Sequence, residues 1–397
     1  MKKTYASGTR KLDASREFCL NDTCPSRGKV GQGNIIIHDS NRGRYRCNIC
    51  KKTFNKRRGT ALEGIRKSDD LFITVISLLS QGCPIQAIVY TYEIDERTVA
   101  SWQERAGLHC EKVHKDKIEQ GNLDPKQVQV DEIRVKARGM VIWMGLAIMV
   151  PTRLWVAGLV SKTRDSNFTD ELLQRVRNCC RALSALLICV DGLKSYPKSI
   201  LKAFREKVKD KPGPGAPRKE VWPDVHIGVV IKRMEKRRVK EVIHRIAHGT
   251  EEMVNALLIS SRGGKIINTA FIERLNGTFR EHLASLTRKC RYAASKVETL
   301  HAGMYLIGCT YNFCLPHCAL SKKEEYGGIL LSTPAMASGL ADHIWSMKEL
   351  LTFKVIPAPL PPPKRKYRRR LQQVSSTLES KKPVVRLRKG VLCSTTG

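Results

Sequence analysis

The sequence predicts an α/β protein, built on a mixed sheet with helices on both faces and preceded by two small N-terminal modules. Three observations indicate this. Strand-like apolar runs alternate with helical patterns between residues 126 and 312, two cysteine pairs precede residue 60, and a helical period runs from 69 to 107. At 397 residues and 42% apolar composition, the chain is long enough for two or three domains with a substantial core.

The net charge of +34 is the strongest global feature of the chain. A surplus of this size attracts polyanions, and nucleic acid is the usual partner, although a merely soluble basic protein is the alternative. No apolar stretch reaches the ~18–20 residues that span a bilayer, and Met1–Tyr5 begin no apolar signal core. We therefore expect a cytoplasmic, nucleoid-associated protein without a membrane partner. Its 14 cysteines favour metal ligands and free thiols over disulfides.

Residues 1–60 contain two cysteine pairs, Cys19 with Cys24 and Cys47 with Cys50. Four thiolates satisfy a tetrahedral zinc dication and fix two loops that would not fold alone. The spacing predicts a zinc ribbon with structural Zn²⁺. The alternative is four unligated thiols.

Residues 65–115 are expected to form a helix-turn-helix DNA-binding domain. Its first helix ends at Gly82, Pro84 opens a second, and a third runs from an N-cap at Asp95 to a C-cap at Gly107. The first helix would bury one apolar face, made of Leu71, Phe72, Val75, Leu78 and Leu79. The third would expose a set of polar side chains to the major groove: Glu96, Arg97, Thr98, Ser101 and Arg105. An ordinary helical connector is the alternative.

Residues 126–312 form the largest predicted domain. Its expected strands are Val128–Val135, Val141–Val150, Leu154–Ser161, Leu186–Asp191 and Val225–Ile231. Its expected helices are Thr169–Arg181, Tyr196–Val208, the basic segment Lys236–His248, and a helix over Asn268–Arg291. The Pro- and Gly-rich segment Lys211–Pro217 is expected to be a loop. Three successive strands followed by alternating helices and strands are the element order of an RNase H-like α/β fold.

Three carboxylates in this domain are the parts of a divalent-metal site. Asp131 interrupts an apolar strand, where a charge is costly unless something binds it, and Asp191 ends another. Glu273 lies beside the apolar stripe of the last helix and can be aimed at the edge of the sheet. Oxygen ligands favour Mg²⁺ or Mn²⁺, and two such ions support phosphoryl transfer. Glu132 and Asp224 are rival ligands, but strand alternation points Glu132 away from Asp131 and we expect Asp224 to be structural.

These residues resemble the DDE transposases of bacterial insertion sequences. The matching segments are Asp131-Glu132 in a strand, Val190-Asp191-Gly192, and Phe271–Arg280, in which Glu273, Arg274 and Asn276 fit the E-R-x-N signature. Compact members of that family also carry a zinc ribbon and a helix-turn-helix, so the resemblance covers roughly residues 15–315. It implies that Asp131, Asp191 and Glu273 are catalytic and hold the metals. The 82-residue step from Asp191 to Glu273 then implies an insertion around residues 205–262.

The resemblance implies transposition: binding of terminal inverted repeats in double-stranded DNA, 3′-end nicking, and strand transfer into a target. Each DNA end needs a catalytic centre, so at least a dimer is expected. No GxxxxGK[ST] motif occurs, so no nucleotide cofactor is expected. The side chains expected along the DNA path are Asn276, Arg280, Arg288, Lys289, Arg291 and Lys296.

Residues 313–397 are expected to be an extension ending in a Pro-rich, basic, disordered tail that binds phosphates. A further group of Cys309, Cys314, Cys318 and His317 has irregular spacing, which favours free thiols on a packed helix over a metal site. Two other functions remain open from the sequence: a nuclease of the same fold that joins nothing, and a domesticated transposase that binds DNA without catalysis.

Overall fold

The computed structural model describes residues 12–137, 139–207, 218–236, 238–286, 296–323 and 327–357. The predicted loop Lys211–Pro217, the side chains of Arg288, Lys289 and Arg291, and the basic tail from residue 358 lie outside these ranges. Among the described residues, every helix is too short or too polar to cross a lipid bilayer.

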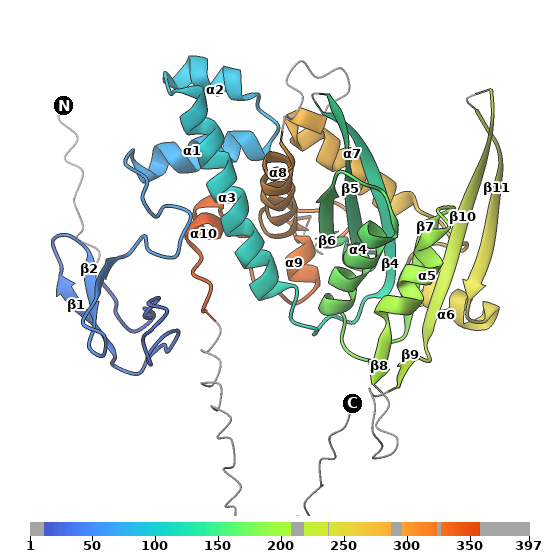
Figure 1. Ribbon diagram of the computed structural model, residues 1–397, viewed down its shortest axis with the longest axis horizontal. Coiled ribbons are helices and arrows are strands. Elements are labelled where there is room, and N and C mark those ends of the chain that lie inside the picture. Colours follow the sequence, from blue (N-terminus) through green and yellow to red (C-terminus); the bar gives the residue numbers. More distant parts are fainter. Residues whose placement is uncertain are drawn as a thin grey trace, which may run out of the picture. The chain divides into compact units, whose positions relative to one another are not determined.

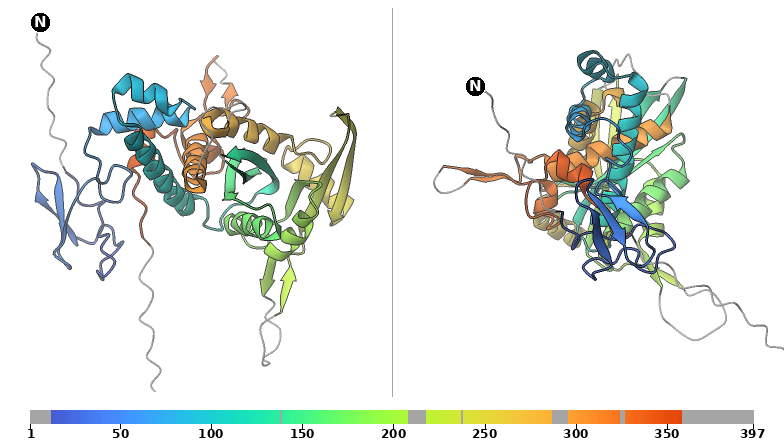
Figure 2. Two further views of the ribbon diagram at one scale, coloured as in Figure 1. Left: turned by 45° about the horizontal axis from the view of Figure 1, so that its top comes forward. Right: turned by 90° about the vertical axis from the view of Figure 1, so that its left-hand side faces the viewer.

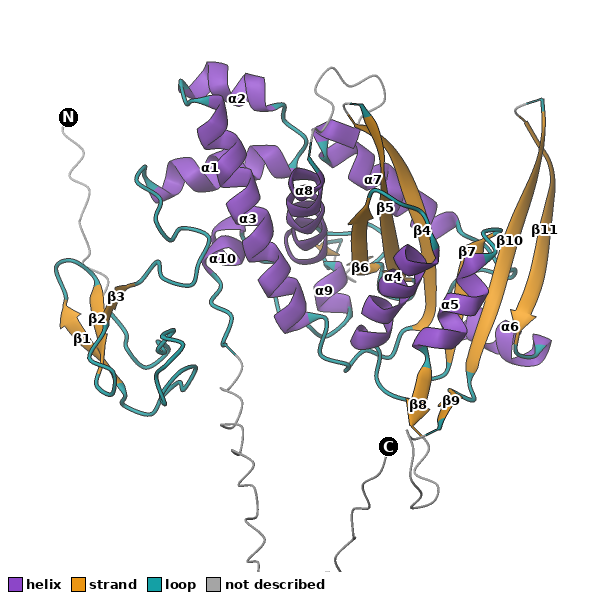
Figure 3. Ribbon diagram, in the orientation of Figure 1, coloured by secondary structure: helices purple, strands orange, loops and turns teal. Residues whose placement is uncertain are grey.

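A six-stranded mixed sheet with helices packed on it confirms the α/β class (Figure 1, Figure 3). Its strands are β4 (Lys126–Ala137), β5 (Met140–Met149), β6 (Leu154–Ser161), β7 (Leu186–Asp191), β10 (Val225–Glu235) and β11 (Arg238–His248). The order across the sheet is β11-β10-β7-β4-β5-β6. Strands β4, β5 and β6 are antiparallel neighbours, β7 is parallel to both β4 and β10, and β11 runs antiparallel to β10.

Helices cover both faces of this sheet, which explains why its central strands are apolar runs rather than alternating ones. On one face lie α4 (Ser166–Cys179) and α5 (Ser195–Ala203), and Gly145 of β5 leaves room for the α4 side chains Phe168 and Leu172. On the other lie α6 (Glu251–Ser260) and α7 (Ala270–His282). The side chain of Gln129 on β4 accepts hydrogen bonds of 2.9 and 3.0 Å from the first backbone amides of α7.

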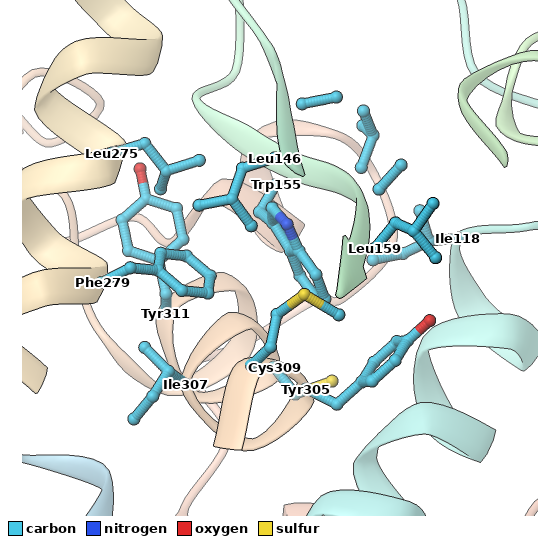
Figure 4. Close-up of a cluster of buried hydrophobic side chains, with 14 of the residues drawn as sticks. Ile118, Leu146, Trp155, Leu159, Leu275, Phe279, Tyr305, Ile307, Cys309 and Tyr311 are labelled. Atoms are coloured by element: carbon cyan, nitrogen blue, oxygen red, sulfur yellow. The ribbon is translucent and has the colours of Figure 1, made fainter. Parts of the chain in front are cut away.

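A buried aromatic group joins α7 to α8 (Val297–Cys309) and to β6 (Figure 4). The Trp155 ring lies 5.9 Å from that of Phe279 and 5.5 Å from that of Tyr305. Helix α8 runs into a π-helical turn at Thr310–Cys314, whose Asn312 amide bonds both backbone groups of Trp155. The remaining C-terminal elements are short: β12 (Lys322–Lys323), β13 (Ile329–Leu330), α9 (Pro334–Ala337) and α10 (Met347–Thr352).

The N-terminal segment forms a small three-stranded antiparallel sheet of β1 (Ile35–Asp39), β2 (Arg44–Cys47) and β3 (Thr53–Asn55). Its own core is small and contains Cys19, Cys24 and Cys47 together with Ile35, Tyr45 and Phe54. With so few apolar side chains, this segment depends on a further constraint for its stability.

Three helices follow: α1 (Asp69–Ser80), α2 (Ile85–Tyr92) and α3 (Glu96–Lys117). The predicted N-cap is confirmed, because the Asp95 side chain accepts from the backbone amides of Arg97 and Thr98. The predicted C-cap at Gly107 is wrong, since α3 continues for another ten residues. Gly107 instead lies where α3 meets α8: a Cβ there would come within 2.2 Å of the Ala302 carbonyl oxygen. Figure 2 shows α3 and α8 side by side.

Three other element predictions are corrected. The basic segment Lys236–His248 is not a helix but strand β11, whose Val239, Val242, Ile243 and Ile246 are β-branched and which pairs along β10. The predicted helix Tyr196–Val208 ends at Ala203, after which β8 (Arg205–Lys207) pairs with β9 (Lys219–Val221). The predicted helix Asn268–Arg291 ends at His282, with a 3-10 turn at Ala284–Leu286.

Candidate active site and metal sites

A cleft of about 560 Å³ lies where β4 and β7 separate. The two strands pair as far as Gln129 and Cys189, so Asp131 and Asp191 both follow the last paired residues. Glu273, in the first turn of α7, lines the same cleft. The structure thus brings together the three acids predicted from the sequence.

Asp131 has the most perturbed environment of the three acids. Its carboxylate accepts a 2.8 Å hydrogen bond from the Asn276 side-chain amide. Burial, together with the neighbouring charges of Asp191 and Glu273, raises the pKa of Asp131 to about 7. The cleft therefore concentrates more negative charge than its own cations neutralise.

Asp191 is held at the end of β7 by its own turn. Its Oδ1 accepts a 3.0 Å bond from the Leu193 backbone amide, and Oδ2 lies 3.5 Å from the Arg164 guanidinium.

Glu273 is about half exposed and forms an ion pair with Lys232 on β10. Burial raises the pKa of Glu273, but hydrogen bonds from Lys232 and Thr269 outweigh it and hold that pKa below its usual value. One carboxylate oxygen of Asp131, one of Asp191 and one of Glu132 lie within 4.8 Å of one another, and Glu273 stands outside this group.

Glu132 is closer to the site than strand alternation alone indicated. Its side chain points to the α5 face, where the Tyr196 hydroxyl donates a 2.5 Å hydrogen bond and Arg164 forms an ion pair with it. Only 2% of this side chain is exposed. Arg164 also stacks over the Trp143 ring, at 4.9 Å from its centroid. Tyr196 thus holds one oxygen of Glu132 by a hydrogen bond and Arg164 holds the other by an ion pair, so Glu132 supports Arg164 and, through it, Asp191.

The donor set of the cleft fits a hard divalent cation. All its candidate ligands are carboxylate oxygens, which Mg²⁺ and Mn²⁺ prefer, and the lining holds three acids, Asp131, Asp191 and Glu273, against the two cations Arg164 and Lys232. Asp131 and Asp191 would hold such an ion, with Glu273 as the third ligand once its side chain leaves Lys232.

The four N-terminal cysteines form a second group of metal-ligand geometry. Cys19 and Cys50 sulfurs lie 3.6 Å apart, and those of Cys24 and Cys47 lie 3.8 Å apart. Tetrahedral zinc with Zn–S bonds of about 2.3 Å requires S–S separations of about 3.8 Å. The geometry therefore fits Zn²⁺ closely. Within the described ranges, this group and the carboxylates above are the two clusters of metal-ligating side chains.

The residues predicted to contact DNA differ in their surroundings. Arg97 and Ser101 are exposed on the first turns of α3 and Thr98 is half-buried, whereas Arg105 donates to the Glu63 carbonyl. Arg280 is half-buried near Asp131. Asn276, also predicted to lie along the DNA path, is only 2% exposed and donates to Asp131, which places it behind that acid.

Two rival sites receive no support. Asp224 precedes β10 and its carbonyl accepts from Leu186, at the opposite end of β7 from Asp191. Cys309 is fully buried and donates to the Cys110 carbonyl, while Cys318 is exposed. Sequence reasoning missed Arg164 and Lys232, which line the cleft, and the buried Tyr196, which donates to Glu132; none of them lies in a local motif.

No protein-family model matches the chain, and no curated protein shows significant sequence similarity to it.

Proposed function

We propose that this protein is a DDE transposase, which nicks the 3′ ends of a mobile element and joins them to target DNA. The observation that carries the proposal is the convergence of Asp131, Asp191 and Glu273 on one cleft from two strands and a helix. Burial and the charges of Asp191 and Glu273 raise the pKa of Asp131, and three acids lining one cleft make chemical sense around cations.

The sheet supports an RNase H-like assignment for this domain. Numbered along the chain, its first five strands lie in the order 3-2-1-4-5, with the first three antiparallel and the fourth and fifth parallel to the first. The strand-end placement of Asp131 and Asp191, and the delivery of Glu273 by a later helix, agree with the resemblance drawn from the sequence motifs.

DNA as the substrate is supported by the net charge of +34 and by the N-terminal modules. In the proposed assignment, α1 to α3 form a helix-turn-helix whose exposed Arg97 and Ser101 read base edges, and the cysteine cluster is a zinc ribbon. Because each element end needs its own cleft, the working form would contain at least two copies of the chain.

Bound Mg²⁺ would supply the charge that activates an attacking hydroxyl and stabilises the departing oxygen. The protein's own residues position the reaction. Asn276 fixes the Asp131 carboxylate, Arg164 and the Leu193 amide orient Asp191, and Lys232 is placed to receive a phosphate when Glu273 turns to the metal. Arg280 adds positive charge beside the scissile strand.

The test is a gel assay on labelled element ends in magnesium, scoring DNA binding, nicking and joined product together. Asp131→Asn, Asp191→Asn and Glu273→Gln should each reduce nicking and joining at least a hundredfold while end binding persists. Asp224→Asn, at the far end of the strands, is the matched control and should keep its activity. Joining by the Asp191→Asn protein would refute the mechanism. Nicking without joining in the unmodified protein would favour a nuclease, and binding alone a domesticated, non-catalytic protein.

A further inference from the structure

A second, smaller cavity lies on the other side of α7 from the catalytic cleft. It measures about 80 Å³, the room of roughly two or three waters, and opens between α7, the β5–β6 turn and the segment after α8. Helix α7 thus carries three faces. Leu275 and Phe279 enter the core, Glu273 and Asn276 face the acids, and the face of Phe271, Arg274 and Thr278 lines this cavity.

Two arginines converge on the cavity. Arg153 lies in the tight β5–β6 turn with a φ of +59°, a left-handed conformation that is unfavourable for a residue with a side chain. Its guanidinium stacks over Phe271 at 3.9 Å from the ring centroid and donates to the Val150 carbonyl. Arg274 projects from α7 into the same space. Among the described residues, neither arginine has a carboxylate within ion-pair distance.

Two neutral donors complete the lining. The Nδ1 atom of His317 accepts from the Ala319 backbone amide at 3.2 Å, which leaves the ring proton on Nε2. Tyr311 is buried beside it, with the two rings edge to face at 6.4 Å, and its hydroxyl has no partner among the described side chains.

The electrostatic field in the cavity is positive. Burial lowers the pKa of His317, and the charges of Arg153 and Arg274 lower it further. Burial also lowers the pKa of Arg153, and Arg274 adds to the effect. Like charges held together around a small polar cavity are stabilised by an anion that accepts hydrogen bonds from all of them.

We propose that this cavity is a binding site for a single phosphate group, held by Arg153, Arg274, His317 and Tyr311. A tetrahedral oxyanion fits the volume, and planar guanidinium forks are the side chains best suited to it. The phosphate belongs either to a DNA strand that passes over α7 or to a free phosphate compound. Only the first source rests on the proposed transposase function.

The first experiment uses inorganic phosphate and the full chain with labelled histidine, at constant ionic strength. The His317→Gln variant identifies the imidazole resonance of His317, because that resonance is missing from its spectrum. Phosphate should shift this resonance in a saturable way and should raise the pKa of His317. Arg274→Gln should weaken this binding about tenfold, because an exposed helix position loses a charged hydrogen-bond donor without disturbing the core. Arg181→Gln, an exposed arginine at the far end of α4, is the control and should bind phosphate normally. A His317 resonance that ignores phosphate would overturn the proposal.

The second experiment identifies the source of the phosphate. If a DNA strand supplies it, Arg274→Gln should reduce the slope of log K against log salt for an end duplex by about one, and inorganic phosphate should compete. If the slope is unchanged while inorganic phosphate still binds, the site serves a free phosphate compound. The Asp191→Asn protein should retain the phosphate response, so failure of the catalytic proposal and failure of this one give different results.

Discussion

The side-chain amide of Asn276 on α7 donates a 2.8 Å hydrogen bond to the carboxylate of Asp131 on β4. Asn276 is buried, and its own Oδ1 has no hydrogen-bond partner among the described atoms. The role that the contacts indicate for its side chain is therefore to fix the direction of the Asp131 carboxylate. Asn276→Ala should leave Asp131 free to rotate. We expect nicking to need a several-fold higher magnesium concentration, measured as the metal dependence of the gel assay. An unchanged metal dependence would contradict a positioning role.

Glu132→Gln tests whether the contacts of Glu132 with Arg164 and Tyr196 stabilise the protein beside Asp191. The change removes a negative charge that Arg164 neutralises and weakens an acceptor of the Tyr196 hydroxyl. We expect a loss of about 1–3 kcal/mol in the free energy of unfolding, as for a buried charge left without its partner. Chemical denaturation measures it, with Glu171→Gln on the exposed surface of α4 as the control. A loss no larger than in the control would show that Glu132 is solvated.

The cysteine cluster should bind about one zinc per chain. Cys47 is fully buried in the cluster, so Cys47→Ser should remove the metal and unfold the N-terminal sheet while the central sheet stays folded. Metal analysis and circular dichroism of reduced protein test this, with the exposed Cys318→Ser as the control. Folded, zinc-free protein would rule out the ribbon.

The close approach of α3 and α8 predicts opposite outcomes for two glycine substitutions. Gly107→Ala should cost about 1–3 kcal/mol, because its Cβ would overlap the Ala302 backbone. Gly277→Ala, on the exposed side of α7 with nothing within 4 Å, should instead stabilise by about 0.5–1 kcal/mol. Thermal unfolding of both variants provides the comparison. Equal effects would mean that α3 and α8 do not touch in solution.

The buried His114 should make the free energy of unfolding depend on pH. Burial lowers the pKa of His114 to about 3, and its Nε2 donates to the Val156 carbonyl at 3.1 Å. The unfolded chain takes up this proton near pH 6.5 and the folded one only near pH 3. The contribution of His114 to the free energy of unfolding is therefore fully present above about pH 6.5. It is lost as the pH falls from 6.5 toward 3, by about 2 kcal/mol at pH 5. His114→Gln should flatten this dependence in urea titrations from pH 5 to 8, and His244→Gln on exposed β11 should not.

The sequence was informative where local pattern decides structure. The central strands are apolar over their whole length because both faces are covered, and the acids that interrupt them marked the site. Strand β11 was misassigned because it is largely exposed, so its side chains show no period of burial. Its pairing with β10 overrides any helical preference. Likewise, Lys232 reaches the cleft on β10 and Arg164 on the segment between β6 and α4, and no spacing in the sequence predicts that these two elements meet.

The contact at Gly107 also fixes how far the start of α3 lies from the point where α3 meets α8. In the proposed transposase, α3 carries the base-reading Arg97 and Ser101 near its start and is anchored to the catalytic domain at Gly107, about 9 to 15 Å further along at 1.5 Å per residue. Because α3 is one continuous helix, it would hold the recognised bases at a fixed distance from the cleft. One extra base pair between the recognised bases and the cut would displace the scissile phosphate by about 3.4 Å and turn it by roughly a tenth of a helical repeat. In the proposed transposase, the offset between α3 and the cleft would therefore fix the distance from the recognised sequence to the cleavage point.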